Sequence, residues 1–163
     1  NINKNLLKDS KKISPQKRKK LANYIKKNST YSIGKASIKE IEKLNILQAT
    51  LLSMKRAINN LKDKPNIVLI DGNHAPKNLS YQYRTIVQGD EKIPAISAAS
   101  IIAKVARDRY ITRLAKNYIP YGWHTNFGYG TKKHLNAINK FGVTKHHRKS
   151  FKPVHNILLG KKK

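Results

Sequence analysis

Two aspartates, Asp71 and Asp90, occupy the same kind of place in the sequence. Asp71 directly follows the apolar run 67–70, and Asp90 follows the strand-like segment 83–87 with a glycine beside it. In α/β sheets, ligands bind in the crevice outside the carboxyl ends of the strands, so two such carboxylates can face one site. Mg²⁺ prefers oxygen ligands, and metals held between carboxylates and a phosphate stabilise the attacking and leaving oxygens of a displacement. The pair therefore indicates metal-assisted hydrolysis of a phosphodiester.

A structural interpretation of the same residues stays open. Asp-Gly and Gly-Asn are common turn pairs, so the sequence DGN at 71–73 is also typical of a simple turn. The chain has eight acidic residues against thirty-five Lys and Arg, which allows elimination. Five acids are interpreted as solvated, ion-paired or favoured in the first turns of a helix: Asp9, Asp63, Asp108, Glu40 and Glu42. Asp71, Asp90 and the neighbouring Glu91 remain as candidates.

The formal net charge of +27 is the strongest global signal in the sequence. It predicts a polyanionic partner, most simply nucleic acid, with binding that weakens as the salt concentration rises. Compositional drift toward Lys, Asn and Ile is a second interpretation, and attraction to a membrane surface is a third. No apolar run reaches the length that spans a bilayer. The absence of cysteine excludes thiolate metal sites and fits a reducing cytosol.

Histidines and aromatic residues toward the C-terminus each allow two interpretations. His146 and His147 are followed by two basic residues, so a basic patch is favoured over a zinc site, which needs further well-spaced ligands. The segment 119–131 is rich in aromatic residues and glycine. Its rings can cap the core, the interpretation favoured from the residues alone, or one ring can pack on a nucleotide. Tyr129, with a glycine on each side, suits the second role.

These candidate residues need an α/β scaffold to position them, and the chain is long enough for a single domain. Ser14 and Pro15 suit the start of the first helix, and Ser37 suits the cap of a long second helix. The unbroken apolar run near residue 70 predicts a strand that is covered on both faces. The predicted helices are 15–28, 38–61, 97–118 and 132–142, and the predicted strands are 30–37, 66–70 and 83–87.

Six segments of the sequence resemble ribonuclease HII when they are taken together. They occur in the order and spacing of that family and cover nearly the whole chain: LKDSKKIS, LNILQATLLSMKRAI, IDGNHAP, QGDEKIPAISAASIIAKVARDRY, YGWHTNFGYGTKKHL and GVTKHHRKSF. The resemblance implies a ribonuclease H-like α/β fold, with a central mixed β-sheet flanked by helices and a C-terminal helical portion. It also implies Mg²⁺- or Mn²⁺-dependent endonucleolytic cleavage of the RNA strand of RNA–DNA hybrids.

The resemblance assigns roles to particular residues. Asp71 and Asp90 match two of the family's catalytic, metal-binding carboxylates, although the family's Lys-Gly-Asp block reads Gln-Gly-Asp here. Tyr129 matches the tyrosine that packs on the ribose at the DNA–RNA junction. Lys11 and Lys12 match a block that lies near the substrate backbone, where we expect phosphate contacts. The family cuts on the 5′ side of the ribonucleotide, even a single one embedded in duplex DNA, and leaves 3′-hydroxyl and 5′-phosphate ends.

One block of the family is missing from the chain. The family opens with a strand that ends in Asp-Glu-Ala-Gly-Arg-Gly, and no such motif occurs in this sequence. That block supplies two of the four catalytic carboxylates. We interpret the sequence as an N-terminally truncated ribonuclease HII, with a degenerate, inactive copy as the second interpretation. Because two carboxylates cannot hold both metals, we expect this chain alone to be catalytically impaired.

Two functional hypotheses remain at this point. The first is a cytoplasmic, monomeric nuclease of ribonucleotide excision repair, which acts on RNA–DNA hybrids and on DNA containing single ribonucleotides and has no membrane partner. The second is a basic module that binds nucleic acid without catalysis. Both predict salt-sensitive binding. They differ for the Asp71→Asn variant, because a nuclease loses cleavage and metal binding. A pure binder keeps its affinity, or gains affinity because a negative charge is lost.

Overall fold

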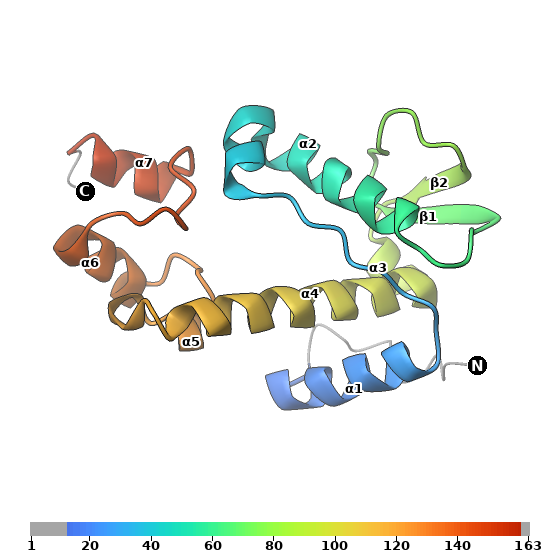
Figure 1. The fold of residues 1–163 in the computed structure, drawn as a ribbon, viewed down its shortest axis with the longest axis horizontal. Coiled ribbons are helices and arrows are strands. Elements are labelled where there is room, and N and C mark those ends of the chain that lie inside the picture. Colours follow the sequence, from blue (N-terminus) through green and yellow to red (C-terminus); the bar gives the residue numbers. More distant parts are fainter. Residues whose placement is uncertain (1–12, 161–163) are drawn as a thin grey trace. The chain divides into compact units, whose positions relative to one another are not determined.

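The computed structural model describes residues 13–160, which form helices and a small parallel sheet (Figure 1). The chain divides into two compact units, whose described parts are residues 13–36 and 47–106 in the first and 37–46 and 107–160 in the second. No helix within residues 13–160 combines the length and the apolar character needed to cross a bilayer. In chain order the elements are α1 (Pro15–Lys27), α2 (Ile38–Asn59), β1 (Ile67–Asp71), β2 (Gln82–Ile86), α3 (Gly89–Lys92), α4 (Pro94–Ala115), η2 (Ile119–Tyr121), α5 (Trp123–Asn126), α6 (Lys132–Phe141) and α7 (Lys152–Leu158).

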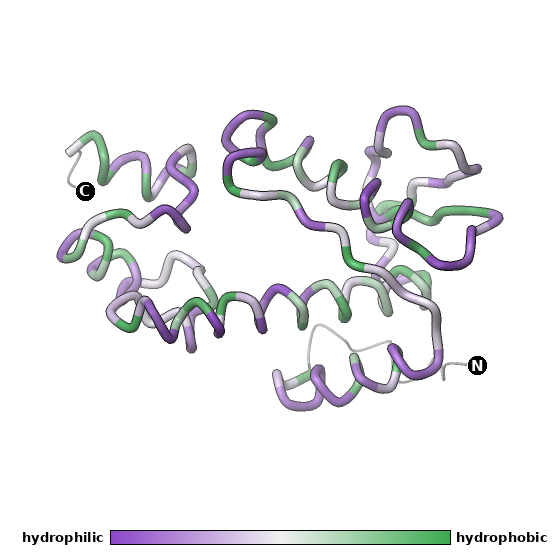
Figure 2. Tube along the Cα trace, in the orientation of Figure 1, coloured by the Kyte–Doolittle hydropathy of each residue, from purple (hydrophilic) through white to green (hydrophobic). Residues whose placement is uncertain are grey.

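Helix α1 and the first half of α4 form the apolar core of the first unit. As predicted, Ser14 caps α1 by accepting a hydrogen bond from the Lys17 amide (3.3 Å), and Pro15 lies in the first turn, where its missing amide hydrogen is not needed. The rest of α1 is basic, and Figure 2 shows this helix mainly in the hydrophilic colours. The core consists of Ala22, Ile25, Ala98, Ile101, Ile102 and Val105.

Strands β1 and β2 form a two-stranded parallel sheet in the described part of the chain. The register runs from Ile67 opposite Gln82 to Asp71 opposite Ile86, and the Gly72 amide continues it by donating to the Ile86 carbonyl over 2.9 Å. Two of the predicted strands are confirmed, each displaced by one residue. Because the strands are parallel, their carboxyl ends lie at the same edge of the sheet, where Asp71 is found.

The prediction of a strand at residues 30–37 is wrong. These residues have no strand partner and pack against α2 instead. The Ser32 hydroxyl donates to the Ala57 carbonyl, and Gly34 lies so close to the Ser53 carbonyl that a Cβ would overlap it. The β-branched and aromatic residues of this segment resemble a strand, but the absent side chain of Gly34 allows contact with a helix.

The prediction that β1 is covered on both faces is also wrong. Ile70 is 4% exposed, but Ile67 is 41% exposed, and no residue of β2 is buried. An apolar run becomes buried only where other elements cover it, and within residues 13–160 β1 pairs with β2 alone. The α/β class and the C-terminal helical portion are confirmed, and the described sheet is narrower than the expected central mixed sheet.

Helix α2 was predicted to be continuous, but its backbone breaks at Asn45. This residue has φ 67° and ψ 169°, and the boundary between the two units follows at residues 46 and 47. Asparagine tolerates positive φ better than most residues, so the apolar periodicity does not reveal the break. The start of α2 agrees with the prediction, because the Ser37 amide donates to the Glu40 carboxylate (2.7 Å) and the Glu40 amide donates to the Ser37 hydroxyl (3.2 Å).

The second unit has an aromatic core. Tyr121 and Trp123 stack with their ring centroids 5.3 Å apart, and both rings are buried. Helix α6 is confirmed where it was predicted, and Thr131 caps it by accepting from the His134 amide (3.3 Å). The core consists of Ala115, Tyr121, Trp123, Ala137, Ile138 and Val154.

Candidate active site and substrate contacts

Asp71 is the last residue of β1, and Asp90 is the second residue of α3, which follows β2. The backbone amide of Gly89 donates a 2.8 Å hydrogen bond to Oδ1 of Asp71, which ties the end of β1 to the residue before Asp90. Asp71 is exposed and Asp90 is half-buried. The structure therefore brings the two predicted aspartates together at one edge of the sheet, within the first unit.

The turn between β2 and Asp90 depends on a close approach at Gly89. Gln88 has a left-handed φ of 56°, and Gly89, which follows it, is buried. A Cβ at Gly89 would lie 2.6 Å from Cδ1 of Ile96 and 3.4 Å from Oδ1 of Asp71. The absence of a side chain thus keeps the amide within reach of the carboxylate. This role was not predicted, and the glycine next to Asp90 was its one signal in the sequence.

The donor chemistry at this edge suits a hard cation. Asp71 and Asp90 offer carboxylate oxygens, and the chain has no cysteine to favour a softer metal. Within residues 13–160, no three His, Cys, Asp or Glu side chains gather closely enough to hold a metal ion. Mg²⁺ commonly binds proteins through one or two carboxylates and retains several waters, so two aspartates fit its requirements.

Tyr129 lies in the second unit, on the loop between α5 and α6. Its side chain is 54% exposed, whereas Trp123 is 3% exposed and belongs to the core. The core-packing interpretation of the aromatic segment is therefore confirmed for Trp123 and wrong for Tyr129. The guanidinium carbon of Arg107 lies 5.1 Å from the centroid of the Tyr129 ring, and Nη1 of Arg107 donates to the Phe127 carbonyl over 3.0 Å. A cation thus holds one side of the exposed ring.

A buried pair of histidines holds the backbone at Tyr129. Nδ1 of His134 lies 2.9 Å from the Tyr129 carbonyl oxygen, and Nε2 of His134 lies 2.9 Å from the indole nitrogen of Trp123. Because an indole N–H can only donate, Nε2 accepts and Nδ1–H donates to Tyr129. Nε2 of His134 also lies 3.2 Å from Nε2 of His147, whose Nδ1 accepts from the Thr144 amide (3.0 Å). Both imidazoles are therefore neutral in this network.

The burial of His147 corrects a sequence prediction. This side chain is 5% exposed, so its assignment to a basic surface patch is wrong. Burial, with a smaller contribution from the nearby His134, lowers the pKa of His147 to about 4. Burial also lowers the pKa of His146, with a smaller contribution from Lys145. The basic residues around the two histidines predict a surface position, but His147 lies in the core.

Two predicted site residues, Lys11 and Lys12, lie outside the described residues, so their phosphate contacts stay predictions. Arg107 and His134, which contact Tyr129 from its ring and its backbone, were not predicted as functional. Arg107 is one of thirty-five Lys and Arg, and its position in the sequence does not distinguish it from the others.

The sequence matches the family model described as "Ribonuclease HII" over residues 1–154. A curated ribonuclease HII of Pelagibacter ubique is 60% identical over 157 residues, which cover 96% of this chain and 84% of that protein. Ribonuclease HII of Cereibacter sphaeroides is 52% identical over 93% of this chain and 72% of its own length. That of Coxiella burnetii is 51% identical over 94% of this chain and 76% of its own length.

Solved structures show the same fold. The crystal structure of ribonuclease H2 from Pyrococcus horikoshii matches with a TM-score of 0.78 and 24% identity, over 95% of this chain and 81% of that chain. The ribonuclease HII in a complex with PCNA from Archaeoglobus fulgidus matches with a TM-score of 0.71 and 25% identity, over 90% of this chain and 78% of that chain. The predicted ribonuclease H-like fold is thus confirmed, and the chain belongs to the ribonuclease HII family.

Proposed function

We propose that this chain carries the metal-binding edge and the ribose contact of a nuclease that cuts on the 5′ side of ribonucleotides. Membership of the ribonuclease HII family indicates a ribonuclease hydrolase that acts on RNA in RNA–DNA hybrids. The proposal adds incision at single ribonucleotides in duplex DNA, with 3′-hydroxyl and 5′-phosphate products. The observation that carries it is the hydrogen bond from the Gly89 amide to Asp71, because it holds Asp71 next to the turn that bears Asp90.

Asp71 and Asp90 are the residues that would hold Mg²⁺ or Mn²⁺. The metal, when bound, would supply positive charge to the phosphate oxygens and activate water. The Gly89 amide leaves Asp71 one carboxylate oxygen outside that hydrogen bond and restrains its rotation. A restrained ligand loses less conformational freedom when it binds a cation, so the Gly89 amide would favour metal binding by orienting the Asp71 carboxylate.

Tyr129 would pack on the ribose at the DNA–RNA junction. Its exposure leaves the ring accessible, and Arg107 and His134 restrict its motion before substrate binds. The charge of +27 supports attraction to a polyanionic duplex, with Lys11 and Lys12 as proposed phosphate contacts. We further propose that the chain acts as a monomer in the cytoplasm and that residues 1–163 form one ribonuclease HII domain.

A cleavage assay tests the proposal in two forms of the protein. Residues 1–163 alone are expected to cut a duplex with a single ribonucleotide slowly or not at all, because two aspartates hold both metals poorly. The same chain preceded by a family strand that ends in Asp-Glu-Ala-Gly-Arg-Gly is expected to cut it with Mg²⁺ or Mn²⁺. Rapid metal-dependent cleavage by residues 1–163 alone would contradict the proposed impairment.

Aspartate variants of the extended chain test the site itself. Asp71→Asn and Asp90→Asn are each expected to slow cleavage by at least about 100-fold, which corresponds to about 2.7 kcal/mol of transition-state stabilisation. Asp63→Asn is the matched control, since it removes the same charge from an exposed residue that bonds Thr30. Unchanged cleavage by Asp71→Asn would show that the site assignment is wrong.

A further inference from the structure

Arg148 is an unusual arginine in the second unit. Its guanidinium carbon lies 3.5 Å from the centroid of the Phe151 ring, and its side chain is half-buried. The guanidinium donates no hydrogen bond to any described residue. In the described residues, every buried side-chain nitrogen or oxygen atom has a hydrogen-bond partner. Because the Arg148 guanidinium has none, its nitrogen atoms are accessible to solvent. A planar group with five N–H donors is therefore fixed by stacking and keeps its donors available.

A second guanidinium, that of Arg107, adds positive charge near the first. Arg148 directly follows His147, whose Nε2 lies 3.2 Å from Nε2 of His134. His134 in turn bonds the carbonyl of Tyr129, the residue whose ring Arg107 covers. Burial lowers the pKa of Arg148, and the charge of Arg107 lowers it further, whereas Tyr129 and Glu42 act in the opposite direction. Arg107 itself stacks on Tyr129 and uses Nη1 to donate to the Phe127 carbonyl. Nη1 of Arg107 also lies 3.7 Å from Oδ1 of Asp108, so this carboxylate offsets part of the repulsion between the two guanidinium groups. The repulsion that is left raises the free energy of the protein without a ligand.

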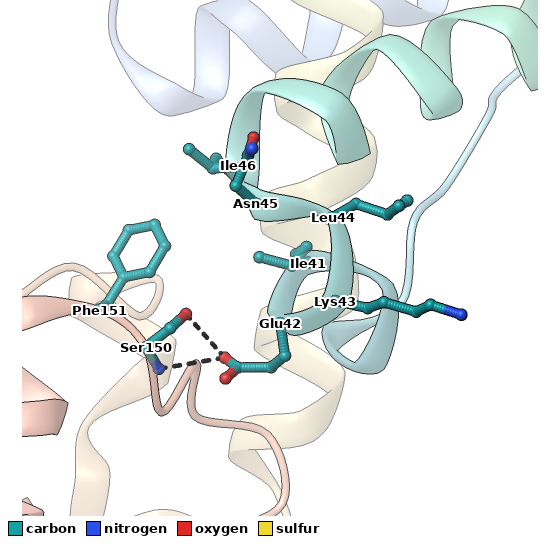
Figure 3. Close-up of a pocket in the computed structure, with 8 residues that line it drawn as sticks. All are labelled: Ile41, Glu42, Lys43, Leu44, Asn45, Ile46, Ser150 and Phe151. Carbon is teal, nitrogen blue, oxygen red and sulfur yellow. Dashed lines mark hydrogen bonds between the residues drawn. The ribbon is translucent and has the colours of Figure 1, made fainter.

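The Glu42 carboxylate, which acts on the charge of Arg148, is held by another partner. Oε1 of Glu42 accepts hydrogen bonds from the amide (3.2 Å) and the hydroxyl (3.1 Å) of Ser150. Figure 3 shows the Glu42 carboxylate directed at Ser150, at the rim of a pocket that Phe151 also lines. Glu42 therefore offsets part of the charge without forming an ion pair with Arg148, and an anion can still bind to both guanidinium groups.

We propose that Arg107 and Arg148 form a binding site for one backbone phosphate of the nucleic acid, next to the sugar that Tyr129 contacts. A phosphate between the two guanidinium groups would relieve their repulsion and accept paired N–H bonds, for which arginine is the suited residue. Stacking on Tyr129 and Phe151 holds both planes in place, so little side-chain freedom is lost on binding. The proposal rests on the proposed function of Tyr129 and extends it to the neighbouring phosphate.

Neutral phosphate analogues test the proposal directly. A set of duplexes with one ribonucleotide would carry a single methylphosphonate at successive positions around it, and Kd would be measured by fluorescence anisotropy in EDTA so that no cleavage occurs. We expect one position at which the methylphosphonate weakens binding of the parent chain about tenfold. In Arg148→Gln and Arg107→Gln the contact with that phosphate is already absent. These variants are therefore expected to bind the duplex with the methylphosphonate at that position as tightly as they bind the unmodified duplex.

Matched variants separate this site from general charge. Lys149→Gln and Arg109→Gln each remove one charge from an exposed residue, one position after Arg148 and two positions after Arg107. Both variants are expected to keep the position-dependent loss of the parent. Arg148→Gln is expected to lower the slope of log Kd against log salt by about one. Arg148→Lys keeps the charge without the planar fork and is expected to bind between the parent and Arg148→Gln.

Two outcomes would overturn the phosphate site. One is an equal methylphosphonate profile for the parent and Arg148→Gln, and the other is loss of the folded far-ultraviolet spectrum in both Arg148→Gln and Arg148→Lys, which would show a structural role. Failure of the proposed function looks different. In that case the extended chain would not cut the ribonucleotide duplex, and Tyr129→Ala would bind it as tightly as the parent does.

Discussion

The Gly89 amide and Oδ1 of Asp71 are joined by a hydrogen bond of 2.8 Å, across a sequence separation of eighteen residues. This contact links the ends of two neighbouring parallel strands. It requires a residue without a side chain at position 89, because Cδ1 of Ile96 occupies the space that a Cβ would take. The packing of Ile96, in α4, against Gly89 thus helps to set the geometry of the proposed metal ligands.

Gly89→Ala is expected to damage the site through a steric clash. The new Cβ would lie 2.6 Å from Cδ1 of Ile96, which is buried, so the turn must shift. We expect the free energy of unfolding to fall by about 1–3 kcal/mol, as in other overpacked sites, and Mn²⁺ affinity to fall with it. Urea denaturation and Mn²⁺ titration followed by electron paramagnetic resonance measure the two effects.

Two further variants make the Gly89 prediction specific. Ile96→Val removes the clashing Cδ1, so the double variant Gly89→Ala/Ile96→Val is expected to recover part of the loss. Gly130→Ala is the matched control, because a Cβ there meets no atom within 4 Å. If the double variant is as impaired as Gly89→Ala, the clash with Ile96 is not the cause.

Removal of the Tyr129 ring is expected to weaken substrate binding and leave stability unchanged. Tyr129→Ala loses the proposed packing on the ribose, which we expect to contribute about 1 kcal/mol, the lower end of the range for bases stacked on aromatic side chains. The ring is 54% exposed, so the unfolding free energy is expected to stay within about 0.5 kcal/mol of the parent. Tyr110→Ala, at a residue that is 52% exposed, is the control. Equal binding losses in both variants would exclude a special role for Tyr129.

The stability of the chain is expected to fall in weak acid because of His147. The folded-state pKa is about 4, below the ordinary value of 6.5, so the unfolded state binds more protons between these pH values. The contribution of His147 is complete above about pH 6.5 and is lost as the pH falls toward 4, by at most about 3 kcal/mol. Urea denaturation at several pH values measures this slope. His147→Gln is expected to flatten it, whereas His124→Gln, at an exposed histidine, is expected to keep it.

His134 is expected to couple energetically to Trp123. His134→Leu leaves the buried indole N–H of Trp123 without its acceptor, which costs about 1–3 kcal/mol. Trp123→Phe removes that donor, so the double variant is expected to lose at least about 0.5 kcal/mol less than the sum of the single variants. The double-mutant cycle is measured by urea denaturation. Strict additivity would mean that the hydrogen bond carries no coupling.

The local signals in the sequence predicted most of the elements. The Ser14–Pro15 start, the Ser37 cap and the apolar spacing of α4 and α6 depend on neighbours within a few residues. Each is found in the structure, although α4 begins and ends three residues earlier than predicted. The same was true of β1 and β2, whose bounds moved by one residue. Residues near 30–37 in the sequence could not show that the predicted strand is absent. The segment packs on α2, and that partner lies about twenty residues further along the chain.

The sequence showed which residue types belong to the candidate site, but it did not show the contacts between them. The scarcity of acids singled out Asp71 and Asp90, and two glycines marked Tyr129 as a presented ring. The resemblance to ribonuclease HII then related these residues to one reaction. Nothing local, however, distinguished Arg107 and Arg148 among thirty-five basic residues, or placed His147 in the core.

The sequence by itself determined the chemistry that is available: oxygen ligands without thiolates, an excess of positive charge, and an aromatic ring between glycines. Tertiary structure decided which of these groups meet. Hydrogen bonding of Asp71 to Gly89, the stacking of Arg107 on Tyr129 and the neutral histidine pair all join residues brought together by folding. Burial and distance set the protonation and the orientation of these groups, and both depend on packing that no short stretch of the sequence contains.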